Sequence, residues 1–160
     1  MATILTLPKN EEWGPVLWEF LHGLLEKSGK SVLGYMLLDQ RREILVILKN
    51  LELVMPCQLC RKHYSEWRKL HPPDRLAQGV EFFPMIRKWL YDLHCNVNTS
   101  RSVETTVSFE DLGKRYGSVN LYILNDRLME ILSRASQLRA INGEAFKTFR
   151  SHCILLQRFF

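Results

Sequence analysis

The 160-residue chain lacks any long hydrophobic run and contains only 4 cysteines. No stretch approaches the roughly 20 consecutive apolar residues that a membrane-spanning helix needs. Residues 1–9 have neither the basic start nor the apolar run of a signal peptide. We therefore expect a soluble chain that is not processed and does not insert into a membrane. The cysteines are too few for a fold built on disulfides.

The sequence also lacks a long run of like charge. The net charge is +5 and the isoelectric point is about 9.1, but the lysines and arginines are scattered, apart from pairs such as Arg41-Arg42 and Arg61-Lys62. This distribution is typical of solvated helix faces and predicts no nucleic-acid partner. No run of alternating apolar and polar residues is long enough to indicate a β-strand, which favours an all-α fold.

The sequence does contain a succession of helical patterns. Asn10 is expected to cap the first helix and Gly29 to end it. Ser108 begins a capping-box pattern for a short helix. Pro84 is compatible only with a position near the start of its helix. The patterns place helices over residues 10–28, 44–55, 57–71, 82–97 and 108–116.

A break at Gly117 separates a second section. Apolar residues at helical spacing predict a helix over 121–135, and an apolar tail follows the break at Asn142-Gly143. We expect a domain of residues 1–116 and a C-terminal helical extension of residues 117–160. The extension would pack on the core or form an assembly surface, for example between two copies of the chain.

The most informative stretch is residues 55–64, where two cysteines stand three apart directly after a proline. Pro56 suits the start of a helix because it has no N–H to donate and its φ is fixed. Cys57 would then lie in the first turn, with Cys60 one turn further along the same face. The helix dipole lowers the pKa of a first-turn thiol. This geometry suits a redox pair in which Cys57 is the outer nucleophile and Cys60 the sheltered partner.

A CxxC pattern by itself leaves three interpretations open: a redox pair, half of a zinc site, or two buried thiols. Zinc could take Cys57, Cys60, His63 and His94 as ligands, which would make the chain a noncatalytic helical adaptor. Against zinc, the sequence has no second close pair of Cys or His residues. A thioredoxin-like fold would require a βαβ pattern, which is absent.

Two other segments favour a bound cofactor. Trp18 and His22 are four apart on the first predicted helix, and His94 and Asn98 are four apart on the helix over 82–97. The first pair alone is typical of a core tryptophan beside a hydrogen-bonded histidine, and the second is a polar pair within an apolar pattern. Three helices that each present planar or polar groups are better explained by a planar, polar cofactor held between them.

These three segments resemble the Erv/ALR flavin-linked sulfhydryl oxidases, over residues 13–116. The chain is similar to the short form of large cytoplasmic DNA viruses, which would place it in the host cytoplasm and the virion. The resemblance implies a four-helix bundle with a short fifth helix around FAD. It also implies oxidation of paired protein thiols, with electrons passing through FAD to oxygen and hydrogen peroxide as the product. The motifs are Trp13-Gly-x-x-x-Trp18-x-x-Leu21-His22, Pro56-Cys57-x-x-Cys60-x-x-His63-Tyr64 and Trp89-x-x-x-x-His94-x-x-Val97-Asn98.

The resemblance assigns a role to each cysteine of the pair. Cys60 would be the sulfur next to the flavin, and Cys57 the sulfur that exchanges with the substrate. Many family members carry a second cysteine pair as a relay, but Cys95 and Cys153 form no CxxC here. We therefore expect a partner protein, such as a small thioredoxin-like or CxxC carrier, to deliver its thiols directly to Cys57.

The chain departs from the family at three places. Cys95 replaces the asparagine that usually follows the third-motif histidine. The family lysine a few residues after Asn98 is missing, so Arg101 would bind phosphate instead. Phe109 would be the aromatic residue near the fifth helix. The FAD contacts that the resemblance implies are Gly14, Trp18, His22, Cys60, His63, His94, Val97, Asn98 and Arg101.

Overall fold

A computed structural model describes residues 4–160 of the chain. These residues form seven α-helices and no β-strand, so the all-α prediction is confirmed. None of the helices in this part of the chain is long and apolar enough to cross a membrane. Single-turn 3₁₀ helices lie at Pro73–Arg75, Gly79–Glu81 and Phe109–Asp111. The α-helices are α1 (Asn10–Lys27), α2 (Gly34–Val54), α3 (Gln58–Leu70), α4 (Phe82–Ser100), α5 (Leu112–Tyr116), α6 (Leu121–Gln137) and α7 (Gly143–Gln157).

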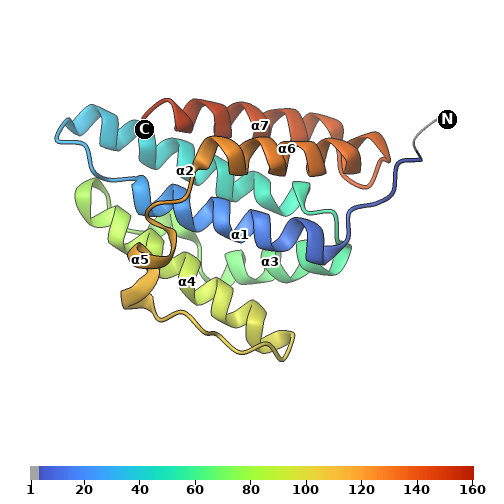
Figure 1. Cartoon of the computed structure of the whole chain (residues 1–160). Coiled ribbons are helices and arrows are strands. Elements are labelled where there is room, and N and C mark those ends of the chain that lie inside the picture. Colours follow the sequence, from blue (N-terminus) through green and yellow to red (C-terminus); the bar gives the residue numbers. More distant parts are fainter. Residues whose placement is uncertain (1–3) are drawn as a thin grey trace.

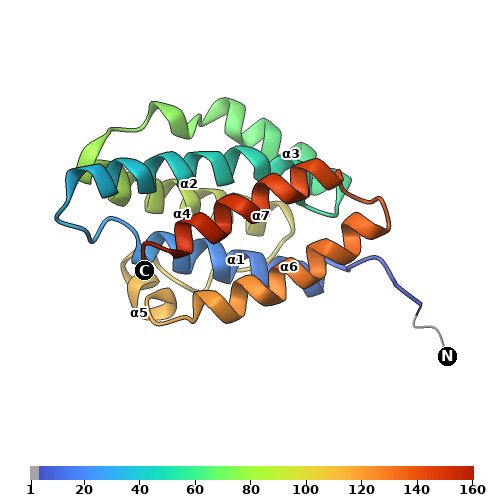
Figure 2. The same ribbon diagram turned by 90° about the horizontal axis from the view of Figure 1, so that it is seen from above.

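The helices are stacked in layers (Figure 1). α6 and α7 lie side by side over α1 and α2, with α6 against α1 and α7 against α2. On the other side of this layer, α4 packs on α1 and α3 packs on α2, while the short α5 also contacts α1. Seen from above, α7 runs between α2 and α6 (Figure 2). α1 and α2 are therefore covered on two sides.

One hydrophobic cluster joins residues of α1, α2, α4, α6 and α7. Phe20 of α1, Ile44 of α2 and Phe149 of α7 are all removed from solvent. Burial of side chains of this size stabilises the fold by about 1.5–3 kcal/mol each. On α1 the buried residues recur three or four apart from Trp13 to Leu24, which is the spacing that predicted the helix.

The predicted ends of several helices are confirmed. α1 ends at Lys27, and Gly29 follows in the left-handed conformation with a φ of 80°. Its N–H donates to Gln40 Oε1 at 2.9 Å. α3 ends at Leu70, before the two consecutive prolines, and Pro84 lies in the first turn of α4. Glycine and proline therefore act where their backbone preferences require.

Three local predictions are wrong. α2 begins at Gly34, well before the predicted start at Ile44. Its first turns bury Leu37 but leave Tyr35 and Leu38 exposed, so this part shows no regular apolar face in the sequence. Asn10 is the first helical residue of α1 rather than its cap, and its side chain points to the start of α3. Ser108 precedes a 3₁₀ turn and makes no side-chain capping hydrogen bond, so the capping box does not form.

The C-terminal helices have well-defined caps and contribute to the common core. The side chains of Asn120 and Asn142 each accept a hydrogen bond from a backbone N–H, which caps α6 and α7 respectively. Phe149 has no exposed surface. Arg134 of α6 forms an ion pair with Glu12 of α1. The extension thus packs on α1 and α2 within the chain; its division from the rest at Tyr116 remains a prediction.

Candidate functional site

Cys57 and Cys60 form a disulfide at the start of α3, with their Cα atoms 5.2 Å apart. Cys57 is the N-cap residue of α3 and has an extended conformation, so its predicted place in the first turn is wrong. The reason is that a first turn has free N–H groups, and the Cys57 sulfur accepts one of them, from Cys60, at 3.2 Å. Both cysteines are half-buried, so exposure alone does not distinguish an outer from an inner sulfur.

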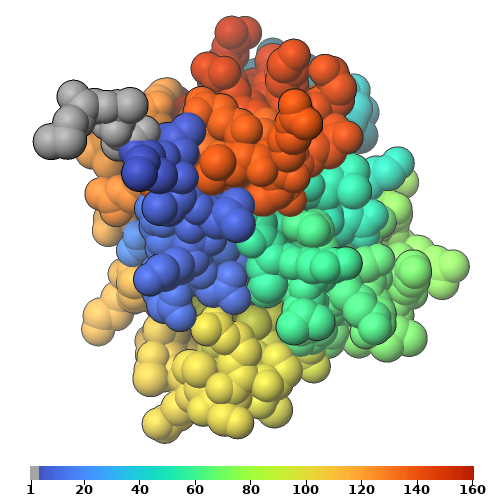
Figure 3. Space-filling view, turned by 90° about the vertical axis from the view of Figure 1, so that its right-hand side faces the viewer, coloured from blue at the N-terminus to red at the C-terminus, as the bar shows by residue number. Residues whose placement is uncertain are grey.

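Arg61 joins the start of α3 to two neighbouring segments. Arg61 donates hydrogen bonds to the carbonyl of Met55 at 2.5 Å and to that of Ala140 at 3.5 Å. These bonds tie the disulfide loop to the turn between α6 and α7. Figure 3 looks at this end of the molecule, where the start of α1 (blue), the start of α3 (blue-green), the end of α4 (yellow) and the α6–α7 turn (orange-red) meet.

The disulfide lies in the wall of a cavity of about 360 Å³ between α1, α2, α3 and α4, called here the cysteine cavity. Cavities of a few hundred Å³ with apolar walls and a few polar groups are typical of small-molecule sites. Trp13 borders this cavity, and its indole Nε1 is buried without a hydrogen-bond partner. The predicted residues that line it, besides the two cysteines, are Gly14, Trp18, His63, Val97 and Arg101.

A second cavity, of about 220 Å³, is bordered by α1, α4, α5 and residues 103–107 and is called here the histidine cavity. His22, His94 and Asn98 line it. Trp18 stacks on His94 with the ring centroids 3.9 Å apart and the planes 6° from parallel. Because Trp18 borders the cysteine cavity and His94 the histidine cavity, the stacked rings form part of the wall of both.

All the residues that the sequence suggested as FAD contacts line one of the two cavities. Sequence reasoning missed Asn10, which contacts both sulfurs, and Tyr116, which stacks on His22 at 4.6 Å. An aromatic residue directly before the break at Gly117 was the available signal for Tyr116. Phe109, the expected aromatic residue, instead packs on Tyr91 and lines neither cavity, because it precedes α5 rather than ending it.

His22, which is buried, and His94, which is half-buried, form a pair of neutral rings. Nε2 of His22 and Nδ1 of His94 are 2.9 Å apart, so one ring donates an N–H hydrogen bond to the other. Burial, together with the nearby His94 and Arg115, lowers the pKa of His22 to about 3. Burial also lowers the pKa of His94 to about 4. Both rings are therefore uncharged at neutral pH and can stack on planar groups.

This histidine pair should make the fold less stable in acid. In the unfolded chain both histidines take up protons as the pH falls below about 6.5, whereas in the folded protein they do so only near pH 4 and 3. The free energy of unfolding is therefore highest above pH 6.5, and it decreases as the pH falls toward 3. Between pH 7.5 and pH 5 we expect the free energy of unfolding to fall by roughly 3–4 kcal/mol, up to about 2 kcal/mol from each histidine.

Urea denaturation at the two pH values measures this loss. The double variant His22→Gln/His94→Gln should show a smaller difference between pH 7.5 and pH 5 than the wild type. His71→Gln, which changes an exposed histidine, is the matched control and should keep the wild-type difference. Equal differences in the wild type and the double variant would contradict the prediction.

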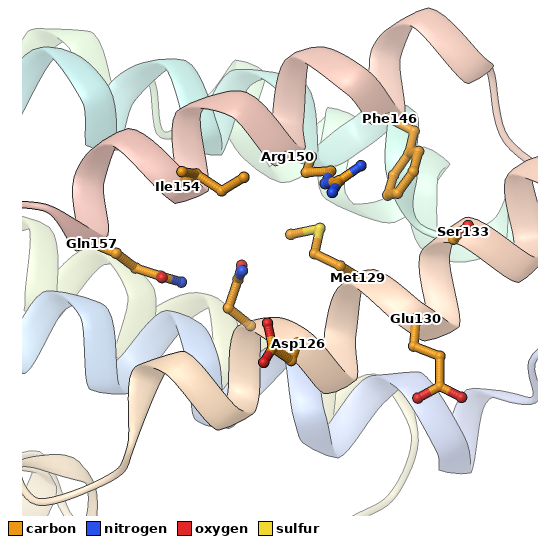
Figure 4. Close-up of a pocket in the computed structure, with 9 residues that line it drawn as sticks. Asp126, Met129, Glu130, Ser133, Phe146, Arg150, Ile154 and Gln157 are labelled. Atoms are coloured by element: carbon orange, nitrogen blue, oxygen red, sulfur yellow. The ribbon is translucent and has the colours of Figure 1, made fainter.

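A larger hollow, of about 510 Å³, lies between α6 and α7 (Figure 4). Asp126 and Glu130 of α6 and Arg150 of α7 stand around it. Its lining residues all come from these two helices and include no cysteine or histidine. This hollow is therefore separate from the disulfide and lacks groups for thiol chemistry.

No family model matches this sequence, and comparisons with curated proteins and with solved structures find no similar protein. The resemblance to the Erv/ALR oxidases therefore remains a prediction from the three motifs. Within residues 4–160, no group of three or more His, Cys, Asp or Glu side chains is arranged to hold a metal ion. The zinc interpretation would require both cysteines as thiolates, whereas here they are joined in a disulfide.

Proposed function

We propose that the protein is an FAD-dependent sulfhydryl oxidase that forms disulfides in other proteins. The observation that carries the proposal is the position of the Cys57–Cys60 disulfide in the wall of a cavity lined by Trp18 and His63. A disulfide beside such a cavity can react with a thiol from outside and a cofactor from inside. In this proposal α1 to α4 are the four-helix bundle that the resemblance implies, and α5 is its fifth helix.

The residues around the two cavities fit FAD. The flat faces of Trp18 and His94, and the stack of His22 on Tyr116, suit aromatic ring systems. The free Nε1–H of Trp13 offers a donor to a carbonyl or ring nitrogen. Arg101, exposed at the end of α4, would hold a phosphate group. When bound, FAD would accept two electrons from the cysteine pair and pass them to oxygen, giving hydrogen peroxide.

In this proposal Cys57 receives the substrate. A substrate thiolate attacks the Cys57 sulfur, and Cys60 leaves as the thiolate that lies toward the cofactor. Cys153 cannot act as a relay because it is fully buried, which raises the pKa of its thiol far above the usual range. Cys95 alone cannot form an internal disulfide, so it cannot take up the two electrons of a substrate dithiol and pass them on. We therefore infer that a thiol-bearing partner, such as a small thioredoxin-like or CxxC carrier, reacts directly with Cys57.

The proposal predicts that the purified protein is yellow and carries about one FAD per chain, released on denaturation because no covalent bond is needed. The measurement is the visible spectrum, followed by quantification of FAD in the supernatant after heat precipitation. Trp18→Ala should reduce the FAD content, because a stacking face is lost, whereas Tyr122→Ala on the exposed side of α6 should not. A colourless protein that takes up no added FAD and carries stoichiometric zinc would instead support the helical adaptor.

A further inference from the structure

Asn10 is the first residue of α1 and reaches both sulfurs of the disulfide. Its Nδ2 lies 3.8 Å from the Cys57 sulfur and 3.9 Å from the Cys60 sulfur. A disulfide sulfur is a weak acceptor, but a thiolate is charged and accepts much stronger hydrogen bonds. The amide is therefore placed to interact more strongly with the reduced pair than with the oxidised pair.

The donors of α3 that lie near the sulfurs already have partners. The Cys60 N–H donates to the Cys57 sulfur. The Arg61 guanidinium is held by main-chain carbonyls, including that of Met55. His63 donates to the Asn96 side chain at 2.7 Å. In the described part of the chain, Asn10 is the side chain with hydrogen-bond geometry to either sulfur.

The first turn of α1 holds Asn10 in place. Trp13 is buried on the same helix, and Glu12 forms its ion pair with Arg134 of α6. The hydrogen bond from Arg134 lowers the pKa of the Glu12 carboxyl, so this pair stays charged at neutral pH. The C-terminal extension thus fixes the helix end that carries the amide, and ordering of a donor before reaction reduces the cost of forming its bond.

We propose that Asn10 is a catalytic hydrogen-bond donor that stabilises the thiolates formed when the Cys57–Cys60 disulfide is reduced. The inference rests on the proposed function. When a substrate thiolate attacks the Cys57 sulfur, a substrate–Cys57 bond forms, the Cys57–Cys60 bond breaks, and the electron pair leaves on Cys60. A second substrate thiolate then attacks the substrate sulfur, closes the substrate disulfide and releases Cys57 as a thiolate. The protons of both substrate thiols go to solvent.

Two variants separate the donor from the shape of the residue. Asn10→Ala removes the donor, and Asn10→Asp keeps the shape but puts a carboxylate beside the sulfurs. The fully reduced protein is alkylated with iodoacetamide across a pH series, and the labelled cysteines are identified by mass spectrometry. Separately, the Cys57–Cys60 pair is equilibrated with glutathione buffers. Neither readout requires turnover with oxygen.

We expect the alkylation rate of the reactive thiol at pH 7 to fall roughly three- to tenfold in Asn10→Ala, because a charged hydrogen bond is lost. The fall should be larger in Asn10→Asp. In both variants the glutathione equilibrium should move toward the disulfide. Arg61, His63 and Arg101, which also face this region, are unchanged in every variant. Asn50→Ala makes the same change on α2, where the amide bonds the Val46 carbonyl, and should behave as wild type.

Unchanged alkylation profiles and glutathione equilibria in both Asn10 variants would overturn the inference, even if turnover were reduced. Failure of the proposed function gives a different result: the wild-type protein would bind no FAD and consume no oxygen with a small dithiol, whatever the glutathione equilibrium of the Asn10 variants. If Asn10→Ala does not fold, the near-isosteric Asn10→Asp decides the question. A normal profile in that variant overturns the inference, because a carboxylate cannot donate the bond.

Discussion

Replacing either Cys57 or Cys60 with serine is expected to abolish dithiol oxidation, lowering the rate by roughly a thousandfold or more. A variant that keeps only one of these cysteines cannot form the internal disulfide that accepts two electrons from the substrate. The measurement is oxygen consumption with a small dithiol, at equal FAD content for each variant. Activity that persists in both variants would contradict the assignment of this pair as the redox centre.

The two serine variants should differ in their spectra. Cys57→Ser leaves the Cys60 thiolate beside the flavin in our proposal, so a long-wavelength absorption band should appear. Cys60→Ser should show no such band. A band in Cys60→Ser alone would mean that Cys57 is the flavin-side sulfur. Because the two cysteines are buried to a similar extent, this measurement decides an assignment that their exposure does not.

The matched control replaces the two remaining cysteines. Cys95→Ser combined with Cys153→Ala should keep turnover with both a small dithiol and a reduced CxxC protein. Alanine is used at Cys153 because that side chain has no exposed surface and a buried hydroxyl would lack a partner. Loss of turnover with the protein substrate alone would show that one of these cysteines belongs to a relay, against direct delivery to Cys57.

Phe149→Ala is expected to destabilise the whole fold, because this α7 side chain lies with no exposed surface in the cluster that α7 shares with α2. Removal of a buried phenylalanine typically costs about 3–5 kcal/mol. In a chain of this size that loss corresponds to a Tm lower by roughly 10 °C. Thermal unfolding followed by circular dichroism measures the change.

Phe160→Ala is the matched control, since Phe160 is 38% exposed and lies after the end of α7. It should shift the Tm by only a degree or two, roughly 0.5 kcal/mol or less. A Phe149→Ala protein as stable as wild type would contradict the role of the extension as part of the core. Below its Tm the Phe149→Ala variant should keep its FAD, because the extension lines neither the cysteine nor the histidine cavity.

The sequence by itself determined the helical class and most helix ends. Apolar spacing along α1 and α4 requires one buried face, and Gly29 and Pro84 act through backbone preferences that are local to each residue. It also determined the candidate chemistry, because Cys57 and Cys60 stand three apart and meet in a disulfide with little help from distant residues.

Only the tertiary structure decided which groups face the sulfurs and what covers α1 and α2. Asn10 reads as a helix cap in the sequence, and its approach to Cys57 depends on the packing of α1 beside α3. Tyr116 reaches His22 only because α5 folds back on α1. The extension could have packed on a partner protein or on the core of its own chain, because an apolar stripe does not specify what it packs against. Contacts between residues far apart in sequence depend on how whole helices pack, which local propensity and spacing do not encode.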